Sequence, residues 1–416
     1  MSLSRFVSAF GLLKGIQYFI ERKTITTITL PDDRPFDEML SSLGFRSLTT
    51  VTIPSTVTSL GSHTFYGCES LKSITIPSSV TSIGDRAFCD CYSLKSITIP
   101  SSITSIGENA FFRCNSLTDI TIPDSVKSIG KEAFGGCASL RNITIPNRVT
   151  SIGKNAFSRS GLTSITLPDS LTSIGKEAFR ECASLRNITI PNRVTSIGEN
   201  AFSGCKALQS ITLPDSLTSI GKEAFGECAS LGNITIPNRV TSIGENAFSR
   251  SGLTSITLPD SLTSIGKEAF RECASLRNIT IPNRVTTIHE DTFGGCTGLQ
   301  SVTLPNSLTS IKYNAFRFCY SLTNITFPDS LISLGEAAFW GCISLQAISL
   351  PDSVTYIGEK AFWECKSLQK ASVSATLEYS HFIVWHHGTE SYAKEKPESS
   401  FPDHTQVERR KAKGDA

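Results

Sequence analysis

A proline recurs every 23 residues through most of this 416-residue chain. Only two of the intervals are shorter, at 22 residues, from Pro146 to Pro168 and from Pro237 to Pro259. A fixed period of this length is typical of solenoids, in which each repeat forms one coil and packs against its neighbours. The sequence therefore predicts a single solenoid of about fifteen coils over residues 31–373.

The repeated unit reads P-x-S-[VL]-T-S-I-G-x-x-A-F-x-x-C-x-S-L-x-x-I-T-[IL]. Its apolar positions fit neither the period of a long helix nor the alternation of a continuous strand. In an early unit Leu71, Ile74 and Ile76 form the L-x-x-I-x-I pattern of a leucine-rich-repeat strand, in which Thr75 points outward. Pro77 ends that strand, because proline cannot donate to a continuing ladder. The A-F-x-x-C stretch that follows has the spacing of a short helical turn.

One column of phenylalanines runs through the repeats. Fourteen of the 24 phenylalanines share one position of the unit, from Phe65 to Phe362, and the shortened units keep it. Equivalent residues of stacked coils lie about 4.8 Å apart along the axis. The column therefore predicts one continuous aromatic spine inside the solenoid.

The unit resembles the BspA-like (Treponema-pallidum-type) leucine-rich repeat, whose units read almost as IPxSVTSIGxxAFxxCxSLxSIT. The resemblance covers roughly residues 31–373 and holds position by position. It implies an α/β repeat solenoid, a curved right-handed coil with a parallel β-sheet on the concave face and short helical turns on the convex side. It also implies a non-catalytic protein, since relatives are often bacterial or protist surface proteins implicated in adhesion and protein binding.

Twelve of the thirteen cysteines share one position of the unit, and Cys89 is the exception. Stacked thiols could bind a soft metal or form disulfides, but side chains in register suit the disulfide dihedral poorly. We interpret the column as buried, small apolar side chains. Residues 158–168 and 249–259 both read SRSGLTSITLP and lack this cysteine. We interpret their deletion as removing the buried thiol position, which argues against any chemistry at that position.

The chain contains no sequence motif for catalysis or cofactor binding: GxSxG, HExxH, phosphate-binding loops and dinucleotide fingerprints are all missing. His63 and His289 are isolated, and the other histidines follow the repeats without a defined ligand spacing. Lysine and glutamate alternate from coil to coil, as in Lys176 and Glu199, which predicts a solvated, self-neutralising ladder. A net charge of +2 gives no reason to expect nucleic acid. The sequence therefore predicts no enzyme activity, cofactor or metal.

Threonine recurs at the outward strand position, beside a row of alternating serine and asparagine. These small uncharged side chains suit a shallow contact with a protein or a glycan, although threonine is also simply a favourable strand residue. The concave sheet is where solenoids usually bind. The predicted binding face comprises Thr144, Thr166, Thr189, Thr212, Thr235, Thr257, Thr280, Asn187, Asn233 and Asn278.

The sequence favours a non-catalytic protein-binding scaffold that uses this face. One alternative is a cell-surface adhesin or surface antigen that binds a host or matrix protein; another is ice or crystal binding, which needs a flat, regular threonine array. Asn187 and its equivalents begin N-I-T sequons, whose glycans would crowd the face. With no clear signal peptide or anchor, the sequence slightly favours a cytoplasmic location over the cell surface. The partner's identity is not predicted.

The ends of the chain differ from the repeats. Residues 1–30 have apolar side chains near helical spacing and are predicted to form an amphipathic cap. Residues 374–387 are predicted to cap the other end, whose open strand edge would otherwise invite association. The polar residues 388–416 are predicted to form a disordered tail. No apolar run is long enough for a membrane-spanning helix.

Overall fold

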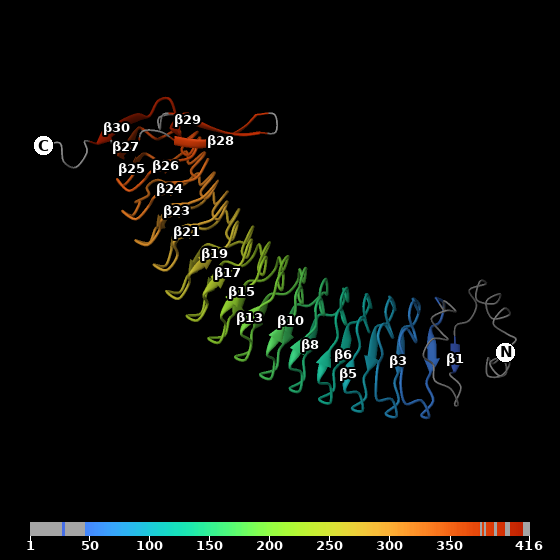
Figure 1. Ribbon diagram of the computed structural model, residues 1–416. Coiled ribbons are helices and arrows are strands. Elements are labelled where there is room, and N and C mark those ends of the chain that lie inside the picture. Colours follow the sequence, from blue (N-terminus) through green and yellow to red (C-terminus); the bar gives the residue numbers. More distant parts are fainter. Residues whose placement is uncertain are drawn as a thin grey trace. The chain divides into compact units, whose positions relative to one another are not determined.

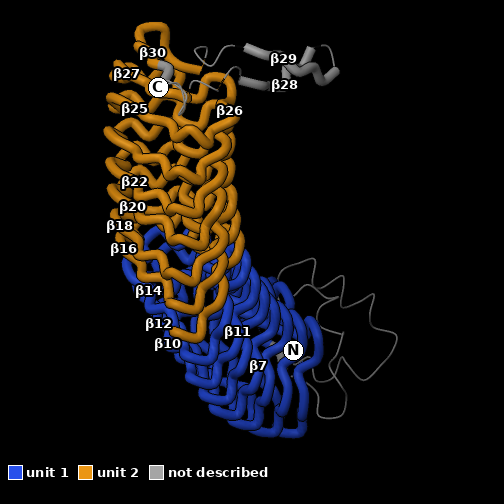
Figure 2. The backbone as a smooth tube through the Cα atoms, turned by 60° about the vertical axis from the view of Figure 1, so that its left-hand side comes forward, with its two compact units in different colours: residues 1–214 blue, residues 215–416 orange. Residues whose placement is uncertain are grey.

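The chain folds as a β-solenoid of about 13 turns with parallel sheets. It divides into two compact units, Met1–Pro214 and Asp215–Ala416, coloured separately in Figure 2. Figure 1 gives the strand order along each unit. The computed structural model describes residues 27–29, 46–374, 377, 380–386, 389–395 and 400–410. The predicted N-terminal cap over residues 1–30 lies outside this part of the chain, apart from one strand.

Most coils in unit 1 contain one three-residue strand. Its middle side chain is buried and its flanking side chains are exposed in nearly every case, because successive strand side chains point to opposite faces. A proline then ends the strand, and its carbonyl accepts a turn-closing hydrogen bond, as in Val80 N–H to Pro77 O at 3.1 Å. The strands are β1 (Thr27–Thr29), β2 (Thr50–Thr52), β3 (Ser73–Thr75), β4 (Ser96–Thr98), β6 (Asp119–Thr121), β8 (Asn142–Thr144), β10 (Ser164–Thr166), β12 (Asn187–Thr189) and β14 (Ser210–Thr212).

These strands do not form one continuous sheet. They pair in parallel as four short sheets, β1–β2, β3–β4–β6, β8–β10 and β12–β14. A second set of two-residue strands, at the S-I positions of the unit, forms a longer parallel ladder in which isoleucines stack on isoleucines. Its strands in unit 1 are β5 (Ser105–Ile106), β7 (Ser128–Ile129), β9 (Ser151–Ile152), β11 (Ser173–Ile174) and β13 (Ser196–Ile197).

Unit 2 repeats this organisation. Its longer strands form the parallel sheets β16–β18, β20–β22 and β25–β27–β30, its two-residue strands form the ladders β15–β17–β19 and β21–β23–β24–β26, and an antiparallel hairpin joins β28 to β29. The bounds are β15 (Ser219–Ile220), β16 (Asn233–Thr235), β17 (Ser242–Ile243), β18 (Ser255–Thr257), β19 (Ser264–Ile265), β20 (Asn278–Thr280), β21 (Thr287–Ile288), β22 (Ser301–Thr303), β23 (Ser310–Ile311), β24 (Ser333–Leu334), β25 (Ala347–Ser349), β26 (Tyr356–Ile357), β27 (Lys370–Ser374), β28 (Ser380–His386), β29 (Thr389–Glu395) and β30 (Gln406–Arg410).

The predicted helical turns are wrong: no helical segment is assigned among the described strands and turns of the repeats. The reason is backbone handedness at the tenth and fourteenth positions of the unit, as at Arg86 (φ 56°) and Asp90 (φ 59°). A left-handed residue on either side of the A-F pair interrupts any right-handed helix. The amides bond between coils instead. Arg86 N–H donates to Glu108 O, and Phe88 N–H to Ala110 O, both at 2.8 Å.

The predicted aromatic spine is confirmed within each unit. The repeated phenylalanines are fully buried. Neighbouring ring centroids lie 5.2–5.6 Å apart in unit 1, with Phe88 and Phe111 only 2° from parallel. The coil spacing holds the rings in this offset stack, so each coil completes its core only when a neighbour covers it.

The cysteine column is buried as predicted, and none of its thiols forms a disulfide within the described part of the chain. Each thiol with a described partner in the preceding coil donates to the carbonyl oxygen of that coil's phenylalanine, as Cys91 Sγ does to Phe65 O at 3.2 Å. Distances in the other coils are similar, for example 3.2 Å from Cys137 to Phe111. The thiols are therefore buried hydrogen-bond donors as well as small apolar groups.

The two shortened coils correct one interpretation. The buried thiol position does not disappear there, because Ser160 fills it with 3% exposure and lies 3.3 Å from Cys182 Sγ. The deletion falls after this serine, at Gly161, whose N–H donates to Cys137 O at 3.0 Å. A Cβ at Gly161 would lie 2.0 Å from Ala138 O, so only glycine fits this tight corner. The second shortened coil repeats the arrangement.

The C-terminal end also differs from the prediction. Residues 400–410, expected to be disordered, form part of a further coil. Phe362 N–H donates to Ser400 O at 2.9 Å, and the Phe401 ring stacks on Phe362 at 5.1 Å. β30 then pairs in parallel with β27. Within the predicted cap 374–387, Leu377 is buried, whereas the side chains of β28 lie outside the described part. The rest of the domain division stays a prediction.

Candidate binding face

The strand face is defined by the exposed side chains of the three-residue strands. The structure places all ten predicted residues on it, each exposed. Their inward neighbours, such as Ile143 and Ile188, are buried and hold the strands on the core. The ten are Thr144 on β8, Thr166 on β10, Asn187 and Thr189 on β12, Thr212 on β14, Asn233 and Thr235 on β16, Thr257 on β18, and Asn278 and Thr280 on β20.

The strand face is built from pairs of coils, here called strand modules. In the β8–β10 module Thr144 lies opposite Thr166 and Asn142 opposite Ser164. The Ser164 hydroxyl donates to Asn142 Oδ1 at 2.7 Å. The modules β12–β14, β16–β18 and β20–β22 repeat this bond at 2.6–2.7 Å. Each module therefore presents two aligned threonines beside an oriented asparagine amide.

Sequence reasoning missed the modules. Its uniform threonine row predicted a continuous sheet, whereas the structure joins each N-I-T strand to the S-I-T or S-V-T strand after it. The alternation of N-I-T and S-I-T along the chain was the signal that could have revealed this grouping. Where one sheet ends and the next begins, between β6 and β8, a cleft of about 280 Å³ opens. Thr121 and Asp124 line one side of it, and Asn142 and Thr144 the other.

The chemistry available on the strand modules is hydrogen bonding. Threonine and serine hydroxyls donate and accept, and each asparagine amide has two N–H donors with a carbonyl oxygen that can accept more than one bond. None of these groups titrates near neutral pH. The face can therefore bind a polar surface, but these residue types supply no general base or nucleophile activated by one.

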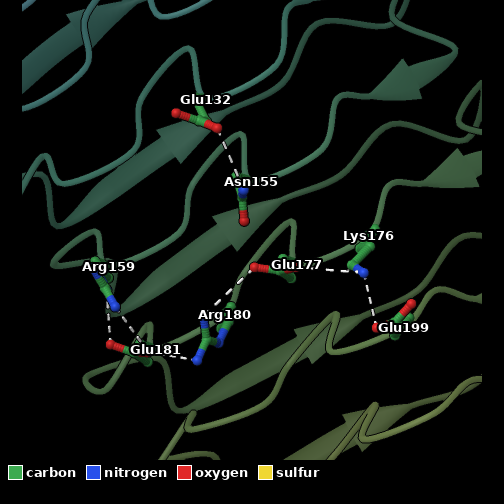
Figure 3. A network of polar contacts seen from close by, with 8 residues as sticks. All are labelled: Glu132, Asn155, Arg159, Lys176, Glu177, Arg180, Glu181 and Glu199. Atoms are coloured by element: carbon green, nitrogen blue, oxygen red, sulfur yellow. Dashed lines mark hydrogen bonds and ion pairs between the residues drawn. The ribbon is translucent and has the colours of Figure 1, made fainter.

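Ion pairs between coils line the turn face, the side of each coil that carries the left-handed residues (Figure 3). Arg159 Nε donates to Glu181 Oε2 at 2.9 Å, Arg180 also reaches Glu181 at 3.3 Å, and Lys176 Nζ lies 2.8 Å from Glu199. The hydrogen bond from Arg159 lowers the pKa of Glu181 despite partial desolvation. The predicted self-neutralising ladder is thus confirmed, and each exposed pair contributes only about 0–1 kcal/mol.

The buried thiols are poor nucleophiles. Burial raises the pKa of Cys68 and Cys137 to about 12, so the reactive thiolate is scarce at neutral pH. No group of three or more His, Cys, Asp or Glu side chains in the described ranges is placed to hold a metal ion. The described residues also include no helix long and apolar enough to cross a membrane.

Known proteins with similar sequences and folds are leucine-rich-repeat proteins. The family model for the BspA type leucine rich repeat region matches residues 43–162, 150–277 and 263–382. A leucine-rich-repeat protein from Bacteroides ovatus ATCC 8483 is 31% identical, with 93% of this chain and 92% of that chain covered and a TM-score of 0.78. A leucine-rich cell-surface protein from Faecalibacterium prausnitzii A2-165 is 32% identical, with 84% and 88% covered and a TM-score of 0.48.

The leucine-rich-repeat protein of T. pallidum is 27% identical, with 49% of this chain and 77% of that chain covered and a TM-score of 0.31. No match was found among curated proteins. The family model spans most of the repeats, and the Bacteroides ovatus protein matches in both sequence and fold. This chain belongs to the BspA-type leucine-rich-repeat family.

Proposed function

We propose that this protein is a non-catalytic scaffold that binds a partner protein on its strand face. Solenoids of its family are typically non-catalytic, and the family is associated with protein binding. One observation carries the choice of surface: on the strand modules the exposed threonines lie in register beside an asparagine amide that a serine hydroxyl orients, whereas the repeated phenylalanines and cysteines are buried. The turn face is a weaker candidate, because many of its charges are paired with each other.

A partner that lies along several strand modules would make many weak contacts of one kind. Each module offers two threonine hydroxyls and one amide in fixed register. Protein interfaces carry about one hydrogen bond per 100–200 Å² of buried surface, which small polar side chains can supply without aromatic anchors. Loss of one threonine should therefore matter little, whereas several lysines across the face should block approach by bulk and charge.

The test is a pull-down with the full chain and two matched variants. The first variant carries four strand-face changes in unit 1: Thr144→Lys, Thr166→Lys, Thr189→Lys and Thr212→Lys. The control adds the same charge at exposed threonines elsewhere on the coils, where Lys127 already occupies the equivalent position. Its changes are Thr104→Lys, Thr150→Lys, Thr172→Lys and Thr195→Lys.

We expect the wild type and the control to retain at least one protein that the strand-face variant loses. Equal capture by all three would contradict the use of this face. The adhesin and ice-binding alternatives stay sequence predictions. Protease accessibility on intact cells would test the adhesin, and a thermal-hysteresis measurement would test ice binding.

A further inference from the structure

The turn face of unit 2 departs from the repeat at one place, here called the aromatic patch. It consists of Arg317, Phe318, Tyr320, Trp340 and Ile343, on two neighbouring coils. Equivalent positions elsewhere are mostly glycine, serine, alanine or charged residues. Tyr320 is 41% exposed and Ile343 is 38% exposed, although a coil needs neither for its core. Clustered exposed apolar side chains on a soluble surface mark interaction sites.

Backbone strain shows that the aromatic at position 318 is costly. Phe318 has φ 59°, the left-handed conformation that Gly295 and Gly341 adopt at the same position of neighbouring coils. Several other coils place arginine or glutamate in this conformation, as at Arg250 and Glu272, but Phe318 is the only phenylalanine, tyrosine or tryptophan that adopts it among the described residues. The neighbouring coil makes room for the ring: a Cβ on Gly341 would lie 2.6 Å from Phe318 Cδ1. The repeat thus carries an aromatic where glycine would fold more easily.

A cation lies at the centre of the patch. The Arg317 guanidinium carbon lies 4.3 Å from the Phe318 ring centroid and 4.7 Å from that of Trp340. Arg317 Nε and Trp340 Nε1 are both buried without an acceptor, and Arg317 forms no ion pair with a carboxylate of the described residues. Burial raises the pKa of the Asp291 carboxyl, and the charge of Arg317 opposes that rise without an ion pair between the two groups. By contrast, Arg250 and Arg271 on the turn face of unit 2 are paired with Glu272 and Glu268, each at 2.8 Å.

We propose that the aromatic patch docks an acidic segment of a partner protein, in which an aspartate or glutamate is followed or preceded by an aromatic or aliphatic residue. The stacked guanidinium is held in place for a carboxylate, which it can bind through two parallel hydrogen bonds. Tyr320 and Ile343 receive the apolar neighbour of that carboxylate. Tyrosine, tryptophan and arginine are also the residues that dominate binding energy at protein interfaces.

Stacking of a sugar ring is a weaker explanation. Glycan sites present open aromatic faces, whereas here the guanidinium already covers one face each of Phe318 and Trp340. The proposal is independent of the strand face, because it rests on other residues and on another side of the coil. A failure of one proposal therefore leaves the other standing.

The experiment is selection of a phage-displayed library of random dodecapeptides on the full chain, followed by binding measurements with synthetic copies of the enriched peptides. Arg317→Ser removes the cation and introduces serine, which other coils carry at this position of the repeat as Ser158 and Ser203. Phe318→Gly introduces the residue of Gly295 and Gly341. Tyr66→Ser, which removes an exposed aromatic from the turn face of unit 1, is the matched control.

We expect enriched peptides that pair an acidic residue with an apolar one. Arg317→Ser and Phe318→Gly should each weaken their binding about tenfold or more, and Tyr66→Ser should not. Phe318→Gly should also raise the melting temperature, so lost binding cannot be ascribed to unfolding. The strand-face lysine variant should bind the peptides normally.

Three results would overturn the proposal. They are no enrichment over an unrelated protein, enrichment of neutral or basic peptides, and peptide binding that survives Arg317→Ser. An array of oligosaccharides supplies the competing outcome: sugar binding that requires the aromatic patch would replace the peptide proposal with a glycan site.

Discussion

The tight corner of the shortened coils makes Gly161→Ala the most informative single substitution. Gly161 lies where the deletion brings two coils together, and its Cβ would lie 2.0 Å from Ala138 O. No positive φ is involved at this glycine, so the effect of alanine is steric. The obstacle is backbone, which cannot rotate away as a side chain could.

The structure gives the size of the effect. Real Cβ atoms essentially never approach another heavy atom below 3.0 Å, so the two coils must separate locally by about 1.0 Å. This movement stretches the bond from Gly161 N–H to Cys137 O, now 3.0 Å, beyond hydrogen-bonding distance. Overpacking costs about 1–3 kcal/mol and a lost hydrogen bond about 1 kcal/mol, so we expect a loss of about 3 kcal/mol. For a cooperative unit of roughly 200 residues this lowers Tm by about 6–12 °C.

Thermal unfolding followed by circular dichroism measures the shift, and the chain supplies its own comparisons. Gly252→Ala repeats the clash in the second shortened coil, with a Cβ 2.1 Å from Ala229 O, and should be equally destabilising. Gly232→Ala is the control, because nothing lies within 4 Å of its Cβ. It should stabilise by about 0.4–1 kcal/mol through the unfolded chain. Melting of Gly161→Ala at or above the Tm of Gly232→Ala would refute the steric account.

Two further predictions concern the thiol column and the C-terminal coil. Burial raises the pKa of Cys137 from 9.0 to about 12, so the folded state holds more protons than the unfolded state above pH 9. The free energy of unfolding is therefore unaffected by this thiol below about pH 9 and decreases as the pH rises from 9 toward 12. The urea midpoint of unfolding should therefore fall less steeply between pH 7.5 and pH 11 in Cys137→Ser than in the wild type. Serine is a suitable replacement because Ser160 already occupies this column. Equal slopes for the two proteins would contradict the prediction. Phe401→Ala should cost about 3–5 kcal/mol, because the 2% exposed ring covers Phe362. Unchanged urea unfolding, relative to a His404→Ala surface control, would show that residues 400–410 do not close the solenoid.

Much of this molecule was predictable because its contacts repeat. A side chain at one position of the unit meets mainly its equivalents in the coils before and after it. The shared repeat position of Phe88 and Phe111 therefore predicted the aromatic spine, and that of Cys91 and Cys114 predicted the buried thiols. The exposure of the threonine row followed in the same way from strand alternation at Thr75 and its equivalents.

The turns were less predictable because residue type only partly determines which residues adopt a left-handed backbone conformation. The left-handed fourteenth position is glycine at Gly204 but arginine at Arg159 and glutamate at Glu181. Such residues adopt this conformation only because hydrogen bonds to the next coil, such as Arg159 N–H to Arg180 O at 2.8 Å, offset the strain. Helical spacing in a single unit could not reveal a bond that exists only between two units.

The sequence by itself determined the solenoid, its buried columns and the surface on which threonine is displayed. The reason is that residues repeated at a fixed period contact their equivalents in the adjacent coils. The tertiary structure decided how strands group into modules, how a serine and a glycine close the shortened coils, and how Ser400 and Phe401 stand in for a missing repeat. These features depend on small differences in coil-to-coil distance and hydrogen-bond geometry, which follow from the packed backbone and not from the identity of any one residue.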